Sequence, residues 1–188
     1  MCETGETITK DPQLVDEIDP VDIGYVSIEL NYNHACIATE LGDFRTSLEK
    51  FQAALDVFQR IENIRGPQTT EMEGQWKIRE QSLYGGIANS LDGLGKYEEA
   101  EVKYRQCLAI KTEDDELSPY EVNICRCMLF ENTVEKTEKA ANLLLDFLER
   151  YRAKYGQDES RDYLCVYPSH FPFCTHCNSL GLATPATG

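Results

Sequence analysis

One short pattern of residue types occurs twice in this chain, and it constrains the fold more than any other feature. The residues LGDF at 41–44 and LGKY at 94–97 lie 53 positions apart. Each is followed at equal distances by a small residue, an aromatic residue and another small residue: Ser47, Phe51 and Ala54 in the first copy, Ala100, Tyr104 and Cys107 in the second. A glycine corner followed by such residues at helical spacing is typical of stacked antiparallel helix pairs. The pattern therefore predicts a helical repeat fold and favours binding over catalysis.

Apolar spacing and capping signals extend this prediction to six helices. Asp19-Pro20 marks the start of the first helix, and Gly42 is expected to end it in a left-handed conformation. The predicted ranges are about 20 to 41, 43 to 65, 70 to beyond 91, 96 to 111, 119 to 130, and 134 to 155. Gly85-Gly86 inside the third helix indicate close approach of a neighbouring backbone, with a kink or a ligand surface as the alternative. The sequence thus predicts an all-α fold of three antiparallel helix pairs.

The ends of the chain differ from this helical region. Residues 1–19 are acidic and poor in apolar side chains, so we expect a disordered segment. Residues 20–164 are the predicted repeat domain. Residues 165–188 contain Pro168 and Pro172, show no periodicity and are expected to form an irregular tail. The last helix pair then lacks an obvious capping helix, which makes self-association or a partner plausible.

Charge narrows the classes of partner. The chain has 18 Lys and Arg against 33 Asp and Glu, a net charge of −15. Such a surface repels nucleic acid and anionic lipid and suits a basic protein segment, although acidity can also serve solubility alone. No stretch approaches the length of a membrane span, and the first residues lack the features of a secretory signal. We therefore expect a cytoplasmic protein, with the nucleus left open.

Eight cysteines fit a reducing compartment. Cys36, Cys107, Cys125 and Cys127 fall inside predicted helices, where a free thiol behaves as a small buried hydrophobe. We expect no structural disulfides.

The repeated residues resemble the tetratricopeptide repeat, a 34-residue helix–turn–helix unit, although the spacing of 53 is longer. Longer units of this kind resemble the kinesin-light-chain style of repeat found in many fungal proteins. The resemblance covers about residues 21–164 and includes a third, degenerate unit. In that unit Ala140, Leu144 and Phe147 match the second helix, and Glu135 is expected to replace the corner glycine. The resemblance implies a right-handed α-solenoid whose first helices line a concave groove.

Carried over residue by residue, the resemblance gives a set of expected groove residues. They are Glu29, Tyr32, Asn33, Cys36, Glu40, Ser82, Gly86, Asn89, Asp92, Val122, Cys125, Arg126 and Leu129. In related repeats that hold acidic C-termini, a cage of basic and amide side chains surrounds a carboxylate. Of that cage only Arg126 has a counterpart here, so the resemblance favours a basic or amphipathic helical segment as the ligand.

Chemistry-bearing residues are few. Cys174 and Cys177 form a C-x2-C pair, and Cys165 or His170 could complete a zinc site; incidental cysteines in an unstructured tail are the alternative reading. His34 is interpreted as a packing residue. We find no phosphate loop or nucleophile motif and expect neither catalysis nor a cofactor. The sequence thus favours a protein–protein interaction scaffold. The alternatives are a non-catalytic accessory factor of a metabolic or biosynthetic pathway, or a zinc-binding module.

Overall fold

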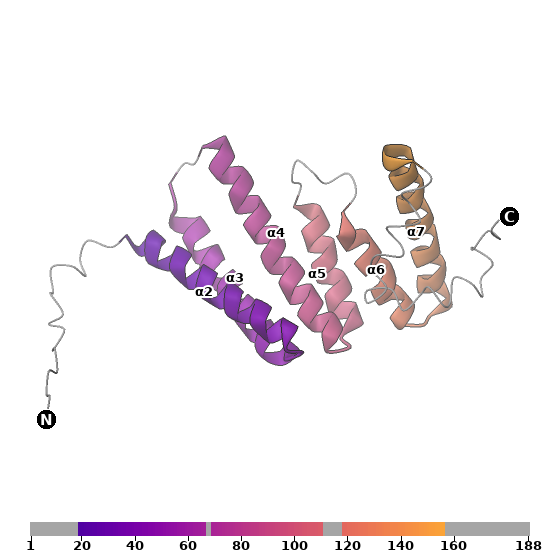
Figure 1. Cartoon of the computed structure of the whole chain (residues 1–188), viewed down its shortest axis with the longest axis horizontal. Coiled ribbons are helices and arrows are strands. Elements are labelled where there is room, and N and C mark those ends of the chain that lie inside the picture. The colour runs from indigo at the N-terminus through magenta and orange to yellow at the C-terminus, as the bar shows by residue number, and fades with distance from the viewer. Residues whose placement is uncertain (1–18, 67–68, 111–117, 157–188) are drawn as a thin grey trace, which may run out of the picture.

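A computed structural model describes residues 19–66, 69–110 and 118–156, and within these ranges the chain forms helices and no strand (Figure 1). The all-α prediction is confirmed. The helices are α2 (Pro20–Glu40), α3 (Phe44–Ile64), α4 (Thr70–Gly93), α5 (Tyr97–Ala109), α6 (Pro119–Phe130) and α7 (Val134–Tyr155).

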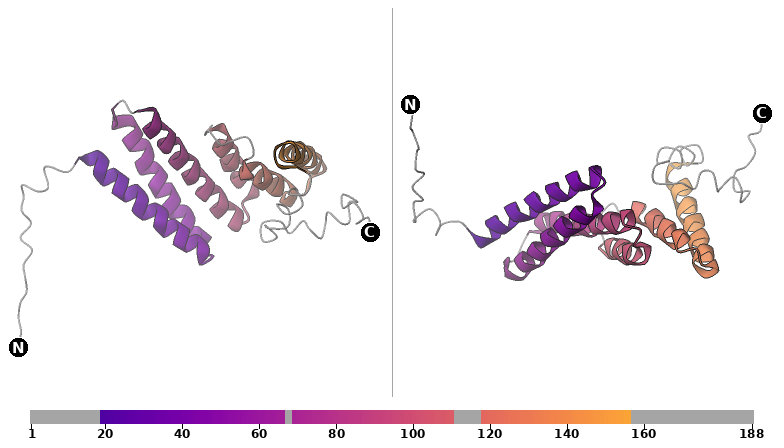
Figure 2. Two further views of the ribbon diagram at one scale, coloured as in Figure 1. Left: turned by 45° about the horizontal axis from the view of Figure 1, so that its top comes forward. Right: turned by 90° about the horizontal axis from the view of Figure 1, so that it is seen from below.

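Each helix packs on the next one in the chain, so that the six form a row from α2 to α7 (Figures 1 and 2). Short corners join α2 to α3, α4 to α5 and α6 to α7, and the helices of each pair run in opposite directions. The predicted division into three antiparallel pairs is therefore confirmed. None of the described helices is long and apolar enough to cross a membrane.

The first two corners share one backbone conformation. Gly42 has φ +74° and Gly95 has φ +73°, a left-handed geometry that glycine adopts without steric cost. At each corner the N–H of the following residue donates to the carbonyl five residues earlier, at 2.8 Å in the first and 2.9 Å in the second. These bonds satisfy the last carbonyls of the helix in the manner of a Schellman cap. The left-handed end predicted at Gly42 is confirmed.

The third corner lies where the repeat pattern does not predict it. The left-handed residue is Asn132, with φ +52°, and Glu135 is inside α7. Asparagine tolerates this conformation better than other residues with a side chain, so no glycine is required. The prediction failed because Ala140 follows the corner by eight residues, whereas Ser47 and Ala100 follow theirs by five. The buried face of α7 is therefore displaced along the helix by three residues.

The core lies between the helices and follows the predicted division into small and aromatic side chains. The small residues that allow close packing are fully buried: Ala35, Ser47, Ala88, Ala100 and Ala140. Among the aromatic residues of the motif, Phe51 and Tyr104 are buried and Phe44 and Tyr97 are half-buried. These contacts join all six helices through one continuous set of buried side chains.

The cysteines inside the helices are free thiols. Cys107, Cys125 and Cys127 are buried, and burial raises the pKa of each to about 12. Their predicted role as small buried hydrophobes is confirmed. Cys36 is only half-buried.

Candidate functional site

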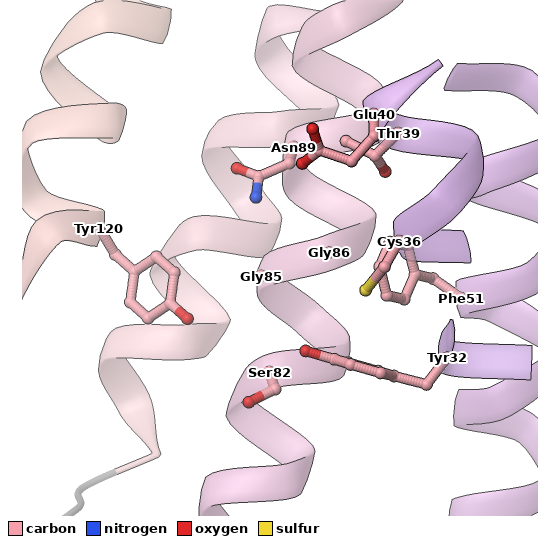
Figure 3. Close-up of a pocket in the computed structure, with 10 residues that line it drawn as sticks. All are labelled: Tyr32, Cys36, Thr39, Glu40, Phe51, Ser82, Gly85, Gly86, Asn89 and Tyr120. Carbon is pink, nitrogen blue, oxygen red and sulfur yellow. The ribbon is translucent and has the colours of Figure 1, made fainter. Parts of the chain in front are cut away.

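A hollow of about 300 Å³ opens between α2, α4 and the start of α6 (Figure 3). Its lining residues are Tyr32, Cys36, Thr39, Glu40, Phe51, Ser82, Gly85, Gly86, Asn89 and Tyr120. All except Phe51 come from α2, α4 or α6, the first helices of the three pairs. The hollow is apolar at its floor and carries hydroxyl, amide, thiol and carboxylate groups around its edge.

Two glycines of α4 determine the shape of the floor. A Cβ added to Gly86 would lie 2.5 Å from the ring of Phe51, and one added to Gly85 would lie 2.8 Å from the hydroxyl of Tyr120. Aromatic rings from both sides therefore rest on bare helix backbone (Figure 3). The sequence indicated a close neighbour at Gly85-Gly86, but the neighbours are aromatic rings and not the backbone of another helix.

Tyr32 is held in place on one side of the hollow. Its ring meets that of Phe51 edge-on at 5.5 Å, and the Arg79 guanidinium lies over it at 4.9 Å. Arg79 also forms an ion pair with Glu29. Partial burial, followed by the nearby Cys36 thiol, raises the pKa of the Tyr32 hydroxyl, so it stays a neutral hydrogen-bonding group at physiological pH.

Asn89 presents an oriented amide on the opposite side. The Tyr104 hydroxyl donates to its Oδ1 at 2.7 Å, which leaves the amide N–H groups for another acceptor. The hydroxyls of Ser82 and Thr39 instead donate to the backbone carbonyls four residues earlier, at 2.8 and 3.0 Å. Glu40 supplies the carboxylate of the lining, with no ion pair among the residues that the structure describes.

The structure brings together only part of the residues expected in the groove. Tyr32, Cys36 and Asn89 line the hollow, as do Glu40, Ser82 and Gly86. Glu29 is exposed and paired with Arg79, and Asn33 is exposed; neither is in the lining.

The expected groove residues of the third pair are directed into the protein. Asp92 and Arg126 form an ion pair with each other and are largely shielded from solvent. Leu129 packs against the core, and Cys125 and Val122 are buried. The charge of Arg126 is therefore used within the protein.

Sequence reasoning missed four lining residues: Thr39, Phe51, Gly85 and Tyr120. Phe51 belongs to the repeated pattern and Tyr120 follows the proline that begins α6, and neither was among the residues expected in the groove. The signal was the Gly85-Gly86 pair, because two adjacent glycines in a helix leave room for large side chains on both sides.

The remaining candidates give no further site. His34 is exposed, so its interpretation as a packing residue is wrong. The possible zinc ligands Cys165, His170, Cys174 and Cys177 lie outside the described residues. Within the described ranges no three His, Cys, Asp or Glu side chains are grouped closely enough to hold a metal ion.

Comparisons of the chain with protein-family models, with curated proteins and with solved structures found no match.

Proposed function

We propose that this chain is a tetratricopeptide-like right-handed α-solenoid that binds a segment of another protein without catalysis. The observation that carries the proposal is the hollow between the first helices of the three pairs, where the repeat resemblance expects a ligand groove. The equal hydrogen-bond pattern at Gly42 and Gly95, 53 residues apart, supports a repeat at the level of the backbone.

The chemistry of the hollow favours a ligand with an apolar anchor and a basic group. The Phe51 ring and the bare backbone at Gly86 give an apolar floor that suits a large aliphatic or aromatic side chain. Glu40 offers a carboxylate to a Lys or Arg of the ligand, and the amide of Asn89 offers donors to a ligand carbonyl. A basic amphipathic segment meets all three requirements, and the net charge of −15 attracts it over longer distances.

Selection of peptides from a random displayed library on the immobilised full chain tests this proposal. We expect enriched peptides to combine Lys or Arg with a large apolar residue. Cys36→Phe fills the hollow and Glu40→Lys reverses its charge, so each should weaken binding at least about tenfold. Asp56→Lys makes the same charge change at an exposed position of α3 outside the hollow and is the matched control.

A second measurement locates the bound peptide. The Cys36 thiol lies in the hollow, so a bound peptide should slow its alkylation, measured by mass spectrometry on the fragment that contains it. Peptides that bind all three variants equally and leave Cys36 unprotected would show that the hollow is not the binding site. Failure to enrich any peptide would remove the proposed function itself.

A further inference from the structure

The outer side of α2 carries a row of exposed aliphatic side chains. We call Ile23, Val26, Leu30, Ile37 and Leu41 the α2 stripe; each is at least half exposed, and Leu30 is 70% exposed. The buried residues of α2 face the rest of the protein: Gly24, Ile28, Ala35 and Ala38. At 100° per residue the centres of the two sets lie about 130° apart around the helix. A helix that is apolar on two different sides suits a position between two neighbours.

The second unit shows what covers this side of such a helix. A residue of α2 corresponds to the residue 53 positions later in α4, so Ile23, Leu30 and Ile37 correspond to Trp76, Leu83 and Ser90. All three counterparts are buried, whereas Arg79 and Leu94, the counterparts of Val26 and Leu41, are not.

The cover in the second unit is the preceding helix, α3. Trp76 stacks on Phe58 of α3 with a centroid distance of 4.0 Å, and the Ser90 hydroxyl lies 2.8 Å from that of Ser47. In α4 the side equivalent to the α2 stripe is therefore packed against the second helix of the previous pair.

The third unit repeats this arrangement. The corner residues Gly95 and Asn132 lie 37 positions apart, so a residue of α4 corresponds to the residue 37 positions later in α6. Ser90 therefore corresponds to Cys127, which is fully buried. Phe130, at the end of the same side of α6, stacks on Tyr97 of the preceding helix α5 at 4.7 Å. The same side of the first helix is thus covered in the second and third units and exposed in the first.

The last helix also carries exposed aliphatic side chains. Counted from the corner, Val134 and Ala141 of α7 take the places of Tyr97 and Tyr104 of α5, which make ring contacts with α6, although the buried face of α7 is displaced by three residues. Val134 is 78% exposed, and Leu145 and Ala141 are exposed beside it. We call Val134, Ala141, Leu145 and Leu148 the α7 stripe. It leaves an apolar side of a second helix exposed at this end of the described row of helices.

From these two stripes we propose that copies of this chain associate head to tail, with the α7 stripe of one copy packed on the α2 stripe of the next. This contact would repeat the α3–α4 and α5–α6 junctions between two molecules. It joins two different surfaces, so it does not close on itself as a twofold dimer does and allows a chain of copies. The inference is independent of the ligand in the hollow.

Charge favours α7 over other occupants of the α2 stripe. α2 has Asp22, Glu29 and Glu40 and no Lys or Arg, so two α2 helices would oppose acid with acid. α7 has five Lys and Arg against four Asp and Glu. The sequence before α2 is acidic, with only Lys10 as a basic residue in 1–18, so placing it on α2 would also oppose acid with acid.

Sedimentation velocity over a range of concentrations tests the proposal with the full chain. We expect the wild type to form dimers and longer species as the concentration rises. Leu30→Glu in the α2 stripe and Leu145→Glu in the α7 stripe should each weaken association about tenfold or more, because each places a charge in an apolar contact. Ile78→Glu changes a similarly exposed isoleucine of α4 and is the control. Circular dichroism verifies that each variant is folded.

Mixing the two stripe variants distinguishes this interface from a symmetric one. The Leu30→Glu copy retains its α7 stripe and the Leu145→Glu copy retains its α2 stripe, so an equimolar mixture should form a one-to-one dimer and no longer species. A wild type that stays monomeric at about 100 μM would overturn the proposal. So would a Leu145→Glu variant that still dimerises alone, since that result would indicate a contact between two α2 helices.

Discussion

Gly86 in the middle of α4 lies where a side chain would collide with Phe51. A Cβ at this position would be 2.5 Å from two carbons of the Phe51 ring, well inside van der Waals contact. Phe51 is buried, and Tyr32 packs edge-on against it, so the ring has little room to move. An extra methyl group in such a site costs about 1–3 kcal/mol. Alanine is favoured over glycine in a helix by about 1 kcal/mol, which offsets part of this cost. We expect Gly86→Ala to lower the free energy of unfolding by up to about 2 kcal/mol.

Gly74 provides a control in the same helix. A Cβ at Gly74 would have no atom within 4 Å beyond its immediate surroundings, so only the helix preference remains. Gly74→Ala should therefore raise the free energy of unfolding by about 0.5–1 kcal/mol. Urea unfolding followed by circular dichroism measures both variants, and the difference between them gives the steric cost at Gly86.

A double-mutant cycle identifies Phe51 as the cause of that cost. Phe51→Leu alone removes buried contacts and should destabilise the protein, but it also makes room beside residue 86. The loss caused by Phe51→Leu should thus be smaller by about 1 kcal/mol in the Gly86→Ala background. If Gly86→Ala were as stabilising as Gly74→Ala, or additive with Phe51→Leu, the ring would not restrict this site and the account of the hollow's floor would be wrong.

Two further predictions concern titratable groups. Burial raises the pKa of Cys107 and Cys127 to about 12, so at pH 8 only about 10⁻⁴ of each thiol is ionised and reactive. In the native protein Cys36 should therefore be alkylated well before them. Equal alkylation rates by mass spectrometry would contradict the burial of Cys107 and Cys127. Partial burial, with a contribution from the nearby Glu62, raises the pKa of Glu80. Ionised Glu80 therefore disfavours the folded state, and Glu80→Gln should stabilise the protein to urea at pH 7. That gain should vanish as the pH falls below the ordinary glutamate range, where Glu80 is neutral in both states. A gain that is the same at both pH values would refute this explanation.

The sequence was sufficient to predict the helices because their signals are local. The Asp19-Pro20 start, the corner at Gly42 and the periodic apolar residues of α3 each depend on neighbouring positions alone. The third corner could not be placed because its position was inferred by counting back from Ala140. Asn132 has the left-handed conformation that glycine has at the other two corners. The buried face of α7 begins three residues further from its corner than in α3 and α5, so counting back from Ala140 gives the wrong residue.

The site was predicted less completely, because its residues are determined by contacts between helices. Tyr32, Cys36 and Asn89 were found from their positions on first helices. The involvement of Asp92 and Arg126 could not be judged from sequence, since opposite charges 34 positions apart become partners only when α4 and α6 pack together. A repeat pattern shows which side of a helix faces a groove, but not which of its polar groups are already paired.

The α2 stripe shows what a comparison of equivalent positions in different repeats adds to the spacing of apolar residues along one helix. Ile23, Leu30 and Ile37 recur every seven residues, which places them on one side of α2 but does not say whether that side is covered. Their counterparts in α4 are buried, and two of them, Trp76 and Ser90, contact α3, so the same position in the array has a defined neighbour in one unit and is exposed in the other. Stability in a repeat array depends on the contacts between adjacent units as well as on each unit. Within the described residues, α2 and α7 each leave one aliphatic side exposed, and the proposed contact between copies would cover both.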